Sequence, residues 1–190
     1  MAASRPSWHT VRVSTLHGTG VFAARDIPAE TRILDYGGRR LTAAQADARW
    51  PVNPDDPYHT FYFALSSGQV IDGGQRGNDA RWINHGCAPN CEARENEDGT
   101  RVAIYALQDI PAGTELLYDY GLVIDEPLTD ALKRNYRCRC GARKCRGTML
   151  AITADADDQA LPGKKTRKEK KGKNEKKGKK AKDKRKKDKR

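Results

Sequence analysis

Residues 81–91, which read RWINHGCAPNC, constrain this chain more than any other stretch. They combine an adjacent amide and imidazole, Asn84 and His85, with a glycine, a proline and two thiols. Both polar side chains donate and accept hydrogen bonds, so neighbours on a tight backbone can direct them at one polar ligand. The stretch therefore predicts a polar binding site. Either of its thiols, Cys87 or Cys91, is also placed to share a metal with a distant cysteine cluster.

That second cluster follows later in the chain, with Cys138, Cys140 and Cys145 in the spacing C-x-C-x4-C. Three thiolates require a fourth ligand to close the tetrahedral zinc site typical of structural metal centres. A free buried cysteine is common singly. Three at this spacing, in a chain whose N-terminus lacks a signal peptide, favour a metal over disulfides. Cys87 and Cys91 are the two candidates for the fourth ligand.

The pattern of apolar residues predicts a mostly β fold with short helices. Short alternating runs are typical of strands, and no alternation of strand and long helix suggests a parallel sheet. A threonine at position 42 with a glutamine three residues later is a capping box, which predicts a helix ending before Pro51. Strands are expected near residues 11–13, 21–23, 32–36, 60–65, 69–72, 101–107 and 115–118, and short helices at 42–50, 78–83 and 128–134.

The charge of the chain is concentrated in its last residues. Residues 163–190 hold 18 of the 36 Lys and Arg but only 4 of the 25 Asp and Glu, so the remainder carries a small net negative charge. The segment has no aromatic residue and almost no aliphatic one, so it cannot bury enough apolar surface to offset the entropy of ordering. We expect a disordered basic tail. It either keeps the protein soluble or binds nucleic acid by neutralising phosphates.

The sequence contains no sign of a membrane segment. No apolar run approaches the roughly 20 residues that a spanning helix needs, and residues 1–6 lack the apolar core of a signal peptide. We therefore expect an intracellular protein, with reduced thiols, that does not contact a membrane.

Four segments in order resemble the SET-domain protein lysine methyltransferases. They are residues 17–22 (HGTGVF), 81–91, 110–121 (IPAGTELLYDYG) and the cysteine cluster with CRCG and CRG. The resemblance implies a SET domain over residues 9–122 and a post-SET zinc-binding segment over 134–150. A linker and the basic tail follow over 151–190. It also implies small sheets around a C-terminal pseudoknot, a rare threaded topology.

The resemblance further implies the residues of the site. Tyr120 matches the catalytic tyrosine of the family, with Tyr118 beside it. Cys87, rather than Cys91, is the implied fourth zinc ligand beside Cys138, Cys140 and Cys145. The residues expected to bind S-adenosylmethionine are Gly18, Thr19, Gly20, Arg81, Asn84, His85, Tyr120 and Leu150.

The implied substrate channel contains Phe61, Ile71 and Tyr118. Many relatives have a tyrosine where Phe61 aligns, so its hydroxyl is lost here unless Tyr58 or Tyr62 replaces it. In the family, the position of Tyr118 controls the number of methyl groups added, and a tyrosine there favours the monomethyl product. A substrate peptide is expected to add as a strand to a sheet edge formed by residues 69–72.

Together these features predict a monomeric enzyme that methylates a lysine of a histone, histone-like or other chromatin or nucleoid protein. It is expected in the bacterial cytoplasm or nucleoid, or in a eukaryotic nucleus. The alternative is a SET-fold architectural protein that has no transferase activity and binds nucleic acid through its tail. The intact Asn84, His85 and Tyr120 favour the enzyme, while Phe61 leaves the alternative open.

Overall fold

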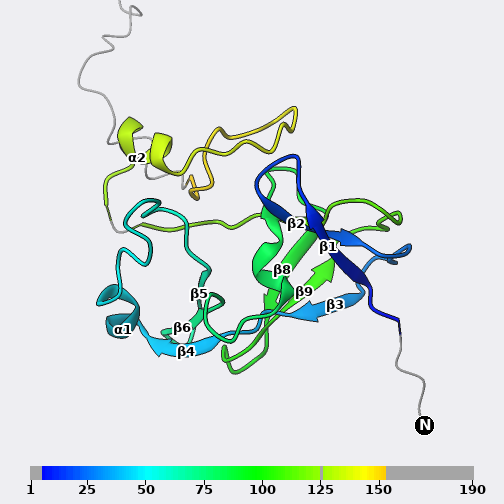
Figure 1. Cartoon of the computed structure of the whole chain (residues 1–190), viewed down its shortest axis with the longest axis horizontal. Coiled ribbons are helices and arrows are strands. Elements are labelled where there is room, and N and C mark those ends of the chain that lie inside the picture. Colours follow the sequence, from blue (N-terminus) through cyan, green and yellow to red (C-terminus); the bar gives the residue numbers. More distant parts are fainter. Residues whose placement is uncertain (1–5, 125, 153–190) are drawn as a thin grey trace, which may run out of the picture.

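The computed structural model describes residues 6–124 and 126–152. Within these ranges the chain forms ten short strands, two short α-helices and one 3-10 turn, gathered into small sheets (Figure 1). This confirms the predicted mostly β fold. The expected basic tail, residues 163–190, lies outside the described residues. No helix in the described part of the chain is long and apolar enough to cross a membrane.

The N-terminal half supplies a hairpin and one strand of a larger sheet. Strands β1 (His9–Val13) and β2 (Thr19–Ala23) pair antiparallel around Gly18, whose positive φ of 47° suits a residue without a Cβ. Strand β3 (Arg32–Asp35) joins β9 (Val102–Ala106), which also pairs with β8 (Cys91–Glu95). The sequence analysis missed β8, because CEARE contains none of the β-branched or aromatic residues that are enriched in strands.

A second three-stranded sheet lies to the left in Figure 1. Its order is β4 (Arg39–Thr42), β6 (Gln69–Asp72), β5 (Tyr62–Ala64). The bounds predicted for β6 are confirmed, but the prediction that it forms a sheet edge is wrong. Both of its sides are paired, because residues 39–42 form a strand that the sequence analysis did not predict. Strands β4 and β5 are the edges of this sheet.

The short helices form where capping residues predict them. At α1 (Ala43–Asp47), the Gln45 amide donates to Thr42 Oγ1 at 3.2 Å, and the Thr42 amide donates to Gln45 Oε1 at 3.0 Å, as in the predicted capping box. The helix ends at Asp47, earlier than predicted. The amides of Arg49 and Trp50 donate to carbonyl oxygens three residues earlier, as in a 3-10 turn, and Pro51 then ends the helical conformation. The turn η1 (Asp79–Trp82) and helix α2 (Asp130–Asn135) complete the elements.

The last strand is inserted between earlier parts of the chain. Strand β10 (Leu117–Tyr118) pairs parallel with β7 (Asn84–His85). Just before it, the Leu116 amide donates to the Val21 carbonyl of β2 at 2.8 Å. Residues 114–118 therefore lie between β2 and residues 84–90, hydrogen-bonded to both. This insertion is what the predicted pseudoknot requires, and it brings three distant motifs together.

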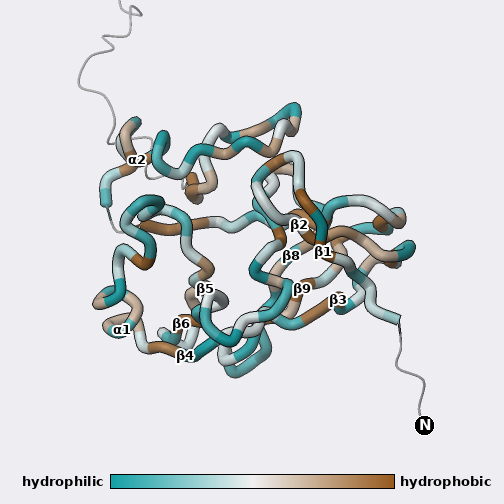
Figure 2. Tube along the Cα trace, viewed as in Figure 1, coloured by the Kyte–Doolittle hydropathy of each residue, from teal (hydrophilic) through white to brown (hydrophobic). Residues whose placement is uncertain are grey.

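The main core lies where the hairpin, the β3-β9-β8 sheet and the inserted strand meet. In Figure 2 the trace changes between hydrophobic and hydrophilic colours within the short strands, so each strand presents only some of its residues to this core. Burying one such aliphatic side chain stabilises the fold by roughly 1.5–3 kcal/mol. The largest fully buried aliphatic side chains are Val21, Ile27, Ile71, Ile83, Val102, Ile104, Ile110, Leu116 and Leu150.

Candidate active site and zinc cluster

The two predicted active-site tyrosines lie together at the end of the inserted strand. The ring centroids of Tyr118 and Tyr120 are 4.9 Å apart; Tyr118 is buried and Tyr120 is partly buried. The Tyr120 hydroxyl donates a 2.8 Å hydrogen bond to the carbonyl oxygen of Ile83, just before the Asn-His pair. The hydroxyl proton is used in that bond, so the Tyr120 oxygen can still accept a hydrogen bond from another donor.

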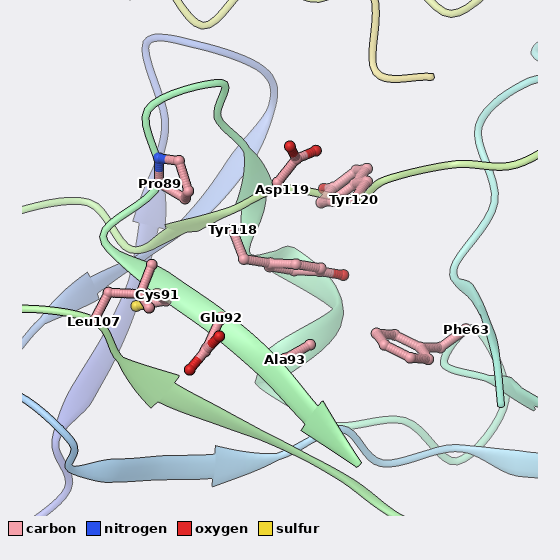
Figure 3. A pocket seen from close by; sticks show the side chains of 9 residues that line it. All are labelled: Phe63, Pro89, Cys91, Glu92, Ala93, Leu107, Tyr118, Asp119 and Tyr120. Atoms are coloured by element: carbon pink, nitrogen blue, oxygen red, sulfur yellow. The ribbon is translucent and has the colours of Figure 1, made fainter. Parts of the chain in front are cut away.

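A pocket of about 400 Å³ opens beside these tyrosines (Figure 3). In the close-up, the ring of Tyr118 extends into the pocket toward Phe63, and Tyr120 lies beside it. The pocket combines the aromatic rings of Phe63, Tyr118 and Tyr120 with two carboxylates, Glu92 and Asp119, so it offers both apolar and acidic groups to a ligand. Its lining residues are Phe63, Pro89, Cys91, Glu92, Ala93, Leu107, Tyr118, Asp119 and Tyr120.

The aromatic wall differs from the predicted channel. Phe61 does not line this pocket; its ring packs at 5.0 Å against Trp82. Neither suggested substitute supplies the missing hydroxyl, because Tyr62 packs against the smaller core cluster and Tyr58 packs against Tyr136. Residue Ile71, also expected in the channel, is 0 % exposed and belongs to the main core.

Tyr36 packs against this wall through Phe63, although it does not itself line the pocket. Its side chain is 6 % exposed, its ring packs at 5.3 Å from Phe63, and its hydroxyl donates to the Phe61 carbonyl oxygen at 3.1 Å. The sequence analysis did not assign Tyr36 to the site. The only local signal was its position between a strand and the two glycines that follow it.

Burial controls the charge state of the tyrosines. Loss of hydration raises the pKa of Tyr118 and of Tyr120 well above the ordinary value near 10, and neighbouring tyrosines add to the effect. Both therefore remain neutral hydroxyls near neutral pH. They act as hydrogen-bonding groups, and neither is a phenolate base.

Asn84 holds the glycine turn against the inserted strand. Its side-chain amide lies 3.1 Å from the Thr19 carbonyl oxygen, 3.3 Å from the His17 carbonyl oxygen and 2.9 Å from Glu115 Oε1. A Cβ on Gly20 would lie 2.5 Å from Glu115 Oε1, so the second glycine makes room for this carboxylate. The predicted binding residues Thr19, Gly20 and Asn84 therefore converge on Glu115, which the sequence analysis did not single out.

Gly18 faces the opposite way. A Cβ built on it would meet no atom within 4 Å, and its φ is positive. The outer side of the turn is therefore open, while the inner side is packed. A ligand can therefore approach the backbone of the turn from its open outer side, at Gly18.

His85 links the tyrosines to the cysteine cluster. Its imidazole is nearly buried, Nδ1 accepts the Tyr120 amide proton at 3.2 Å, and Nε2 lies 3.4 Å from Cys87 Sγ. Desolvation lowers the pKa of His85 and outweighs the opposing effect of Asp119, so the ring stays neutral near neutral pH. In that form Nε2 carries the proton and donates toward the sulfur. Both ring nitrogens of His85 therefore contact other groups of the protein.

The four cysteines named by the family resemblance converge. The Sγ atoms of Cys87, Cys138, Cys140 and Cys145 all lie within 4.8 Å of one another. Cys87 Sγ is 3.6 Å from that of Cys138 and 3.9 Å from that of Cys145. Sulfurs that bind one tetrahedral zinc at about 2.3 Å stand about 3.8 Å apart, so the donor set fits zinc. Cys91 is 0 % exposed, and burial raises its pKa to about 12, as for an inert thiol in a core.

Backbone amides surround the sulfurs of this cysteine cluster, which is called the zinc cluster below for the metal that its donor set fits. The donors are the amides of Arg146 to Cys87, Cys140 to Cys138, Cys87 to Cys140 and Gly147 to Cys145, at 3.4–3.5 Å. Although burial acts to raise the pKa of Cys140, the amide donors and neighbouring thiols lower it to about 7. The amides therefore favour a thiolate at Cys140, the form that binds a metal, whereas burial raises the pKa of Cys87 and of Cys138.

The other predicted cofactor residues lie around this framework. Arg81 donates to the Gly73 carbonyl oxygen at 3.2 Å, and its guanidinium carbon lies 4.5 Å from the Trp82 ring centroid. Leu150 is 1 % exposed and forms a parallel bridge with Leu122, directly after the inserted strand. The segment that carries the last three cysteines is thus joined to the chain just beyond the inserted strand.

Comparison with known proteins agrees with this architecture. Residues 18–121 match the family model described as SET domain. The chain is 35 % identical over 135 residues to "Histone-lysine N-methyltransferase 2B" of Homo sapiens, covering 70 % of this chain and 5 % of that protein. It is 37 % identical over 139 residues to "Histone-lysine N-methyltransferase, H3 lysine-4 specific" of Candida albicans, covering 72 % and 13 %. It is 34 % identical over 137 residues to "Histone-lysine N-methyltransferase SETD2" of Homo sapiens, covering 70 % and 5 %.

The chain therefore spans only a small part of the length of these relatives, between 5 % and 13 %. The matched region contains the glycine turn, the Asn-His pair and both tyrosines, which the inserted strand brings together. From this match and these identities, the chain belongs to the SET-domain family.

Proposed function

We propose that this protein is an S-adenosylmethionine-dependent protein-lysine N-methyltransferase. The observation that carries the proposal is the position of Tyr120. Its hydroxyl proton is bound by the Ile83 carbonyl oxygen, its amide by His85, and its ring borders the aromatic pocket. This leaves one oriented acceptor oxygen at the pocket, which suits an incoming amine.

The glycine turn and the Asn-His pair offer the site for S-adenosylmethionine. The open outer side of Gly18 leaves room for a ligand at the backbone, and the side-chain bonds of Asn84 and His85 hold that backbone in place. Contacts to the cofactor would then come largely from main-chain groups, with Arg81 and Leu150 at the margins. When bound, S-adenosylmethionine supplies an electrophilic methyl group on a sulfonium.

The pocket prepares the lysine. A lysine side chain has a pKa near 10.4 in water and is mostly an ammonium, which is not nucleophilic. The aromatic wall of Phe63, Tyr118 and Tyr120 removes water from it, which disfavours the charged form. The Tyr120 oxygen accepts an N–H of the neutral amine and turns the nitrogen lone pair toward the methyl donor. Such positioning is a large source of rate in bimolecular transfers.

The zinc cluster has a structural role in this proposal. Cys87, Cys138, Cys140 and Cys145 would hold one Zn²⁺ in a closed site with no position for substrate. Because Cys87 belongs to the Asn-His turn, the metal would fasten residues 138–150 onto the cofactor site. Metal binding would then contribute directly to the folding free energy.

The proposed substrate is a lysine in a histone, a histone-like protein or another chromatin or nucleoid protein. The names of the relatives support a histone. The basic tail supports a place on nucleic acid, since residues 163–190 carry an excess of positive charge that binds phosphates without reading sequence. We place the protein on chromatin or nucleoid, acting as a monomer.

The test is transfer of radiolabelled methyl groups from S-adenosylmethionine to core histones and to a purified histone-like nucleoid protein. Wild type should label lysine, and Tyr120→Phe should lose on the order of a hundredfold in rate while still binding S-adenosylhomocysteine. Tyr105→Phe is the matched control, because Tyr105 lies on β9 against Arg94, outside the pocket lining. If wild type binds nucleic acid but labels no protein, the architectural alternative replaces this proposal.

A further inference from the structure

Two charged side chains join the zinc cluster to the catalytic strand. Arg146, which follows the last cysteine, holds the carboxylate of Asp119 with both terminal nitrogens, and its Nη2 donates to Asp119 Oδ1 at 2.7 Å. Asp119 lies between Tyr118 and Tyr120. Such a forked pair fixes both partners in direction as well as distance. We call this ion pair the 119–146 clamp.

The clamp closes a ring of contacts around Tyr120. Asp119 Oδ1 also accepts the Gly121 amide proton at 3.0 Å; His85 Nδ1 lies 3.6 Å away but, having no proton, makes no hydrogen bond to the carboxylate. His85 Nδ1 accepts the Tyr120 amide, while its Nε2 contacts Cys87. The ring returns to Arg146 through its backbone amide, which donates to Cys87 Sγ. Both peptide neighbours of Tyr120 are therefore tied to residues that the zinc cluster holds.

The clamp is also sheltered. The side chain of Arg146 is 25 % exposed and that of Asp119 is 37 % exposed, so the pair is partly screened from water. Two backbone hydrogen bonds also join these segments: the Ala151 amide donates to the Leu122 carbonyl oxygen at 2.8 Å, and the Leu122 amide donates to the Met149 carbonyl oxygen at 3.3 Å. Those contacts do not depend on the identity of residue 146.

We propose that Arg146 and Asp119 are positioning residues, which transmit the rigidity of the zinc cluster to the Tyr120 hydroxyl. The inference rests on the proposed transferase function, since it assigns these residues a place in that reaction. Neither residue touches substrate in this role. Without the clamp, the segment at Tyr120 retains its fold but loses the fixed direction of its hydroxyl.

The test compares Arg146→Ala, Arg146→Lys, Asp119→Asn and the double variant Asp119→Asn/Arg146→Ala with wild type. Arg143→Ala is the matched control, because Arg143 is an exposed arginine on the same segment. All variants should retain one zinc, because only the backbone amide of Arg146 contacts a cysteine. Arg146→Ala should lower kcat for a lysine peptide by on the order of tenfold to a hundredfold, with KM nearly unchanged.

Two further results separate positioning from general destabilisation. The double variant should be no slower than the slower single variant, because one contact is lost in all three. Arg146→Lys should be intermediate, since lysine keeps the charge but not the fork. Three results would overturn the proposal: an unchanged kcat in Arg146→Ala, a fall in kcat in the double variant equal to the product of the two single falls, or loss of zinc from the variants.

A measurement without turnover distinguishes this proposal from the proposed function. Hydrogen exchange of the peptide that contains Tyr120 should be faster in Arg146→Ala and unchanged in Arg143→Ala, with the zinc-bound protein used throughout. If wild type proves inactive but this difference in exchange is present, the transferase proposal fails and the clamp stands as a structural coupling. If exchange is unaffected, the clamp does not hold Tyr120 and the inference is wrong.

Discussion

At the scale of single residues, we propose that the hydroxyl of Tyr118 determines what else fits beside the lysine amine. The side chain is buried, extends into the pocket, and stays neutral because burial raises its pKa. A hydroxyl in an aromatic pocket can hold an ordered water, and that water occupies the volume that a methyl group needs. Tyr36 adds a second hydroxyl near this wall, although its proton is bound to Phe61.

We expect Tyr118→Phe to increase the number of methyl groups added. Displacing one ordered water changes a free energy by at most about 2 kcal/mol, which is enough to change product ratios more than tenfold. Wild type should yield mainly monomethyl-lysine and reach dimethyl-lysine slowly, whereas the variant should proceed to dimethyl- and trimethyl-lysine. Mass spectrometry of a lysine peptide after long incubation measures this. Rapid trimethylation by wild type would contradict it.

Gly20→Ala should weaken cofactor binding. The new Cβ would lie 2.5 Å from Glu115 Oε1 and 2.9 Å from Ser14 Cβ, so the carboxylate must leave its place beside the Asn84 amide. The turn then loses the contact that orders it. Calorimetric titration with S-adenosylhomocysteine should show a clear fall in affinity.

Gly68→Ala is the control for that variant. Gly68 has a φ of 79°, no atom lies within 4 Å of a Cβ there, and its turn connects β5 to β6. The substitution should cost about 1 kcal/mol of stability through backbone strain and leave the affinity unchanged. Equal affinities for Gly20→Ala and wild type would show that Glu115 does not order the turn.

At the scale of elements, the zinc cluster connects the Asn-His turn to residues 138–150. Cys87→Ser removes the only cluster ligand supplied by that turn, so the variant should lose its zinc and much of its stability. The zinc content of the purified protein and thermal unfolding measure these effects. Chelation of wild-type zinc should reproduce the same destabilisation.

Cys91→Ser is the comparison that tests the choice of ligand. Cys91 follows four residues later as the first residue of β8, is buried in the main core, and does not belong to the cluster. The variant should retain one zinc and lose a modest amount of stability, because a buried thiol is replaced by a more polar hydroxyl. Loss of zinc from this variant, with zinc retained in Cys87→Ser, would reverse the assignment.

At the scale of the whole molecule, charge is divided between the folded part and the tail. Residues 163–190 contribute 18 of the 36 basic residues. Deleting them should sharply weaken binding to DNA at low salt, because counterion release supplies the affinity. Methylation of a short peptide should persist, since the site residues all precede the tail. Electrophoretic mobility and salt titration measure the effect; salt-insensitive binding by the full chain would place the contact on the folded part.

Much of this architecture follows from local sequence. The capping box at Thr42 and Gln45 predicts α1, alternation predicts β9 closely, and the turn at residues 66–68 predicts β6 as the returning strand of a hairpin. These features depend on residues within a few positions of one another, so a short window contains all the necessary information. The chemistry of the site is local too: the Asn-His pair, the paired tyrosines and the cysteine spacing are each contiguous in the sequence.

The pairing of distant segments was decided only by the tertiary structure. Residues 69–72 form a strand, as predicted from local sequence. Whether that strand lies at the edge of its sheet depends on its pairing with residues 39–42, which lie far away in the chain. The same holds for Tyr36 beside Phe63, for Glu115 beside Asn84, and for the clamp between Asp119 and Arg146. Local sequence determined which groups this protein has available, because propensity and spacing act over a few residues. Which groups meet was determined by the insertion of residues 114–118 between β2 and the Asn-His turn, because long-range packing alone selects among many possible partners.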